Sequence, residues 1–155
     1  MISNITQRPV NRFRPFAGLE HPREVIRQFT PNWFAATMGT GILALTLPQM
    51  SGIGPEFRPV GEGLWFVTIA LFLLFTALYA ARWVMFSHEA RRIFGHDVVS
   101  MFIGTIPMGL ATIINGCLVF GTGIFGPAII PLAETLWWID VVMSLACGVG
   151  IPYLL

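Results

Sequence analysis

The sequence has 155 residues, of which 55% are hydrophobic and only 11% are charged. Soluble domains carry about 25% charged residues, so this composition excludes an ordinary water-soluble protein. The formal net charge of +1 says nothing about a partner. We therefore expect an all-α integral membrane protein whose principal partner is the lipid bilayer.

Long uncharged stretches define the expected membrane spans. Asp, Glu, Lys and Arg are absent from three of them: residues 28–55, 63–81 and 98–133. A spanning helix needs about 20 apolar residues, and a fourth stretch with only two acids begins near Leu132. After an N-terminal arm at residues 1–29, the transmembrane region at 30–155 is predicted to hold four spans, at about 31–50, 64–86, 100–120 and 132–155.

Local signals refine these elements. Pro22 can open a short interfacial helix within the arm. Pro48 and the Gly52–Pro55 cluster are expected to end the first span, and residues 121–131 to form an outer loop. Tryptophan gathers at membrane interfaces, and the sequence puts all five near predicted span ends: Trp33, Trp65, Trp83, Trp137 and Trp138.

The arginines predict the orientation. All nine basic residues are Arg: five precede the first span, three lie between the second and third, and only Arg58 lies between the first and second. Cytoplasmic loops carry the excess of positive charge, so the N-terminus and the second connection are predicted to be cytoplasmic. We expect a multi-pass protein of the plasma (inner) membrane.

An internal repeat divides the chain into two helical hairpins. A shift of 68 residues aligns Phe34, Thr37 and Gly41 with Phe102, Thr105 and Gly109, and a shift of 72 aligns residues 64–67 with 136–139. Because each hairpin crosses the membrane out and back, the two copies are predicted to be parallel, as in many transporters.

The repeat exposes a stripe of small and weakly polar residues at helical spacing. Its members are Thr37, Gly41, Ala44 and Pro48 in the first span, and Thr105, Gly109, Thr112 and Gly116 in the third. Such residues either pack helices closely or line a narrow path, and the spacing alone favours packing.

Three further residues place polar groups at membrane depth. Pro107 frees a backbone carbonyl that lipid cannot satisfy. Asn115 suits either an interhelical hydrogen bond or a solute contact, and Asp140 is the candidate titratable group, with a structural hydrogen bond as the alternative role.

No cofactor, metal or enzymatic site is expected. Cys117 and Cys147 lie inside spans, and Gly121–Gly126 matches G-x-G-x-x-G without the strand and helix that a dinucleotide site requires. His88 and Glu89 are not followed by a second histidine at zinc-ligand spacing, because Arg92 occupies that position. No nucleic-acid partner is indicated.

Residues 29–41 (FTPNWFAATMGTG) and 100–116 (SMFIGTIPMGLATIING) resemble the first and third helices of the tellurite-resistance/dicarboxylate transporter family. This family is related to plant slow anion channels and to fungal malate and sulfite transporters. The resemblance spans residues 28–155, although His96 is followed by Asp97 where many members have proline.

The resemblance implies ten helices in five parallel hairpins around a pore, with odd-numbered helices inside, usually in a trimer. It implies transport of small anions, first C4-dicarboxylates such as malate, then sulfite or tellurite-related oxyanions. It makes pore-side candidates of Thr37, Gly41, Thr105, Pro107, Gly109 and Thr112, to which spacing adds Asn115. The family's gating phenylalanine lies in the ninth helix, so we expect further helices beyond Leu155. The alternative is a short four-helix assembly protein without transport activity.

Overall fold

The computed structural model describes residues 22–50, 52, 54–88 and 101–154. In these ranges the chain is helical almost throughout and contains no strand. The first half holds α1 (Pro22–Gln28), the 3-10 helix η1 (Pro31–Trp33), α2 (Phe34–Thr46), η2 (Leu47–Gln49) and α3 (Gly54–Met85). The second half holds η4 (Phe102–Gly104), α6 (Thr105–Gly116), the π-helix η5 (Cys117–Gly121), α7 (Thr122–Phe125), η6 (Gly126–Ala128) and α8 (Ile129–Leu154).

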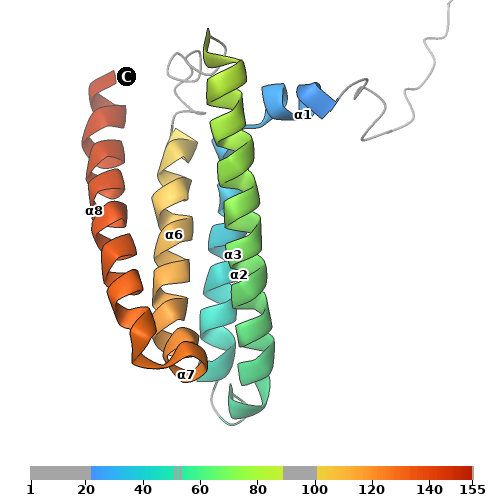
Figure 1. Cartoon of the computed structure of the whole chain (residues 1–155), viewed down its shortest axis with the longest axis vertical. Helices are drawn as coiled ribbons and strands as arrows, with labels where there is room; N and C mark the ends of the chain where they lie inside the picture. The colour runs from blue at the N-terminus through green and yellow to red at the C-terminus, as the bar shows by residue number, and fades with distance from the viewer. Residues whose placement is uncertain (1–21, 51, 53, 89–100, 155) are drawn as a thin grey trace, which may run out of the picture.

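The four long helices lie side by side, and α1 crosses one end of them (Figure 1). The chain turns back between α2 and α3, and again between α6 and α8, at the opposite end. Both reversals use glycine in the left-handed region, Gly52 with φ 89° and Gly126 with φ 71°. Glycine adopts these angles without the steric cost that a Cβ atom adds.

Two helical stretches of the described chain are long and apolar enough to cross a membrane. They are Gly54–Met85 and the continuous stretch Phe102–Tyr153, which reverses at Gly126. The prediction of an all-helical protein is therefore confirmed. The short α2, with Pro31–Trp33 before it and Leu47–Gln49 after it, does not meet this criterion by itself.

Two helical segments extend beyond what the sequence suggested. The second long helix begins at Gly54, before the expected span at 64–86; Pro55 lies in its first turn, where the missing N–H of proline has few intrahelical partners, and Pro59 lies inside the helix. Residues 121–131 were expected to form an outer loop, but almost all of them are helical and belong to α7, η6 and the first turn of α8. Pro22 is the first described residue of α1, and the residues before it lie outside the described ranges, as does most of the cytoplasmic turn expected at residues 87–99.

The hydrophobic core lies where α2, α3, the α6–η5 segment and α8 meet. Its buried members are Ala44, Trp65, Leu110, Ile114, Cys117, Phe120 and Ala133. Trp65 was expected at a span end, but the early start of α3 places it well inside the helix, where its side chain is only 2% exposed. The outer surfaces of α3 and α8 expose apolar side chains such as Leu73, Leu145 and Val149, as lipid contact requires.

Candidate functional site

The small-residue stripe brings α2 and α6 into close contact. Thr37 is fully buried against Gly109, and Thr112 is buried against Gly41. A Cβ atom on either glycine would overlap the hydroxyl of the opposing threonine. Each helix therefore inserts a threonine into a gap that a glycine leaves in the other.

The two threonine hydroxyls are satisfied within their own helices. Thr37 Oγ1 donates to the Phe34 carbonyl at 2.7 Å, and Thr112 Oγ1 donates to the Gly109 carbonyl at 2.8 Å. Ser and Thr commonly bond a preceding helix carbonyl in this way. The structure thus brings together Thr37, Gly41, Gly109 and Thr112 as a helix–helix contact of the small-residue type.

Two other predicted site residues lie where α6 begins. Thr105 Oγ1 donates to the Phe102 carbonyl at 2.6 Å and lies 3.1 Å from the Pro31 carbonyl, so it links α6 to the start of α2. Pro107 is buried in the first turn of α6. In the preceding 3-10 turn η4 the Thr105 N–H bonds the Phe102 carbonyl, and the missing N–H of Pro107 costs little because the first turn of a helix has few intrahelical N–H partners.

A second face, formed by η4 and α6, is more open: two of its residues are exposed, and the other two, Gly104 and Ala111, are half-buried. It consists of Gly104, Met108, Ala111 and Asn115, at spacings of four, three and four residues. Met108 is 60% exposed, Asn115 is exposed, and a Cβ atom on Gly104 would meet nothing within 4 Å. The Asn115 amide donates to the Ala111 carbonyl at 2.9 Å.

The equivalent face of α2 is open as well. The shift of 68 residues relates Gly104, Met108, Ala111 and Asn115 to Ala36, Thr40, Leu43 and Leu47. Ala36 and Leu43 are exposed, while Thr40 is half-buried and its hydroxyl donates to the Ala36 carbonyl at 2.8 Å. The repeat therefore has two matching faces, one buried between α2 and α6 and one left open.

Asp140 lies on neither of these faces. It shares the partly buried side of α8 with Ala133, Leu136 and Met143, of which Ala133 belongs to the core. Its Oδ1 is buried and has no hydrogen-bond partner within the described ranges. The structure therefore separates Asp140 from the threonines and glycines of α2 and α6.

Arg82 is a buried residue that the sequence reasoning missed. It was counted only as a cytoplasmic charge, yet its side chain is 7% exposed and Nη1 donates to the Phe29 carbonyl just after α1. Phe29 packs against Phe75 with ring centroids 5.6 Å apart. Arg82 and Thr105 thus hold two carbonyls of the short segment between α1 and α2, from α3 and α6 respectively.

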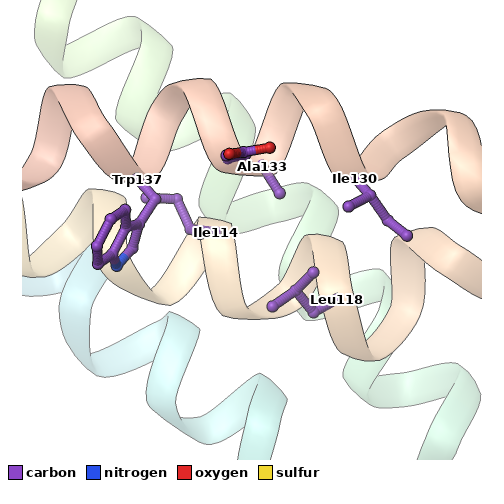
Figure 2. A pocket seen from close by; sticks show the side chains of 6 residues that line it. Ile114, Leu118, Ile130, Ala133 and Trp137 are labelled. Carbon is purple, nitrogen blue, oxygen red and sulfur yellow. The ribbon is translucent and has the colours of Figure 1, made fainter.

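A cavity of about 270 Å³ lies between α8 and the α6–η5 segment. Figure 2 shows Ile130, Ala133 and Trp137 of α8 facing Ile114 and Leu118. Glu134 adds the one charged group of an otherwise apolar lining. Among the described residues no cluster of His, Cys, Asp and Glu could hold a metal ion.

The whole helical region has recognisable relatives, since residues 28–155 match the voltage-dependent anion channel family. The chain belongs to this family. It is 34% identical over 131 residues to a sulfite efflux pump of Trichophyton rubrum, which covers 84% of this chain and 35% of that protein. It is 37% identical over 102 residues to a transporter of Methanocaldococcus jannaschii, covering 66% of this chain and 27% of that protein.

A more distant relative is the malic acid transport protein of Schizosaccharomyces pombe. It is 24% identical to this chain over 119 residues, which cover 77% of this chain and 27% of that protein. The chain thus spans about a third of the length of the curated relatives it matches. No solved structure matches it. The predicted family resemblance is confirmed, and these relatives are transporters and channels rather than enzymes, as expected.

Proposed function

We propose that this chain forms part of a transporter that moves small anions across the plasma (inner) membrane. The match to the voltage-dependent anion channel family over residues 28–155 carries this proposal. C4-dicarboxylates such as malate are the first substrate class and sulfite or tellurite-related oxyanions the second, as two relatives are a malic acid transport protein and a sulfite efflux pump.

The proposed architecture has four membrane spans in two parallel hairpins, as part of a ten-helix pore in a trimer. The reversals between α2 and α3 and between α6 and α8, at the same end of the bundle, support the hairpins (Figure 1). With its flanking 3-10 turns, α2 covers Pro31–Gln49, close to the roughly 20 residues of a span. The relatives' greater length leaves room for the remaining helices.

The anion path is proposed to follow the open faces of α2 and α6. Asn115 gives one N–H to the Ala111 carbonyl, but lipid cannot serve its other N–H and its Oδ1, and an unsatisfied polar group in hydrocarbon costs several kcal/mol. This supports a placement of the exposed Asn115 toward protein or water. The buried Thr37–Gly109 and Gly41–Thr112 contacts would then set the spacing of the two helices that form one wall. Thr105 and Pro107 would fix how α6 enters that wall.

The orientation can be measured with reporter fusions. Alkaline phosphatase fused near Gly123 should be active, and the same enzyme fused near Arg91 should be inactive, because the arginine asymmetry places the Gly123 end outside. The phosphatase activity of each fusion, normalised to its expression, decides the orientation. The reverse pattern would contradict the proposed orientation.

Transport itself is tested by efflux from proteoliposomes. The protein expressed from its complete reading frame should release malate or sulfite faster than protein-free liposomes, with saturation at high anion concentration. Succinate, nitrate and chloride, measured in parallel, rank the substrates. Correctly inserted protein that releases none of the five anions would favour the four-helix assembly protein without transport activity.

A further inference from the structure

The π-helix η5 interrupts the second long helical stretch immediately after Asn115 and Gly116. A π-helix shifts the backbone hydrogen bonds to i→i+5, is rare, and is frequent at functional sites. Within η5 the Thr122 N–H bonds the Cys117 carbonyl, five residues earlier. Just before η5, the Cys117 N–H makes an ordinary i→i−4 bond to the Ile113 carbonyl, and Trp65 Nε1 donates to the same carbonyl at 3.2 Å. An indole of α3 therefore holds a carbonyl of the last α-helical turn before the change of register.

A second side chain of α3 reaches into the π-helix. Arg58 Nη2 donates to the Val119 carbonyl at 3.2 Å, while Arg58 Nε lies 3.1 Å from Glu62 Oε1. The guanidinium carbon also lies 5.9 Å from the centroid of the Phe120 ring. Thus α3 donates one hydrogen bond just before η5, to Ile113, and one within it, to Val119.

The fit around Trp65 leaves its ring little freedom. A Cβ atom on Gly116 would overlap the indole, so the ring occupies the gap that this glycine provides. Phe120 is fully buried beside it, with ring centroids 6.1 Å apart. The ring is buried, and its N–H bonds the Ile113 carbonyl, which sets the direction of the indole.

We infer that Trp65 is a positioning residue that holds the last α-helical turn before η5 and thereby directs Asn115 toward the anion path, an inference that rests on the proposed function. At about 100° per residue, Asn115 lies about 130° around the helix from the mean direction of Ile113 and Gly116, the two positions that Trp65 grips. If η5 relaxed to α-helical bonding, the helix before η5 would rotate relative to the helix after it by about 100°.

The test removes only the hydrogen-bond donor of Trp65, its indole N–H. Trp65→3-benzothienylalanine replaces the indole N–H by sulfur at nearly constant shape, and the same replacement at the exposed Trp137 is the matched control. Amide hydrogen exchange over residues 113–122 should accelerate about fivefold, the effect of one net hydrogen bond, while residues 105–110 stay protected. The ratio of malate to sulfite efflux should change in the Trp65 variant and not in the control.

Unchanged exchange at residues 113–122 would overturn the inference. Faster exchange with an unchanged efflux ratio would also overturn it, because Trp65 would then be structural and not positioning. If the wild-type protein transports neither anion, the proposed function fails by itself. The exchange measurement then still decides whether Trp65 holds the turn before η5.

Discussion

Gly116→Leu is expected to abolish the accumulation of folded protein. Even the first side-chain atom at this position would overlap the Trp65 indole, which is 2% exposed and backed by the fully buried Phe120. Overpacking a filled core costs about 1–3 kcal/mol or more, and here a rigid ring rather than a flexible side chain must move. Size-exclusion chromatography of a fluorescent fusion would show aggregate in place of the symmetric wild-type peak.

The control for this substitution is Gly148→Leu in α8. A Cβ atom on Gly148 would meet nothing within 4 Å, and this glycine is exposed. The same change should therefore leave the elution profile and the thermal stability close to those of the wild type. A monodisperse Gly116→Leu protein would contradict the docking of Trp65 against α6.

Ala111→Trp is expected to reduce anion efflux to the background of protein-free liposomes while the protein still folds. Ala111 lies on the open face of α6 between Met108 and Asn115, so a large ring there would fill the path without entering the contact between α2 and α6. Malate and sulfite efflux, normalised to inserted protein, measure the effect.

Ala77→Trp makes the same change on the exposed side of α3, and its efflux should match the wild type. Equal losses in both variants would point to a general effect of tryptophan on folding. Normal efflux by Ala111→Trp would contradict the open face as the path. The buried positions Thr37, Gly41, Gly109 and Thr112 would then have to be reconsidered as its lining.

The sequence predicted which stripe residues would be near each other, because a period of 3.6 places Thr105, Gly109, Thr112 and Gly116 on one side of a helix. It could not predict what they touch. The reciprocal contact of Thr37 with Gly109 and of Thr112 with Gly41 depends on how α2 and α6 dock, which no local spacing specifies.

The burial of Trp65 and Arg82 was not predicted, for a related reason. Average preferences place tryptophan at interfaces and arginine in cytoplasmic loops, whereas the early start of α3 and its packing bury both side chains. The π-helix at Cys117–Gly121 was likewise not predicted, since its sequence, CLVFG, is equally compatible with an α-helix. Its partners, the Trp65 indole and the Arg58 guanidinium, lie far away in the chain.

The reciprocal packing of threonine against glycine between α2 and α6 couples residues of the two halves of an internal duplication. Because the hydroxyl of Thr112 fills the space above Gly41, an alanine at position 41 requires a smaller residue at position 112, and the pair Thr37 and Gly109 follows the same rule. Residues in contact have non-additive effects on stability, so Thr37→Ala should be a mild change by itself and should rescue Gly109→Ala, where only the Thr37 hydroxyl is in the way. Related chains should therefore vary at these positions in pairs, and each half of the duplication would have restricted the divergence of the other since the two copies arose.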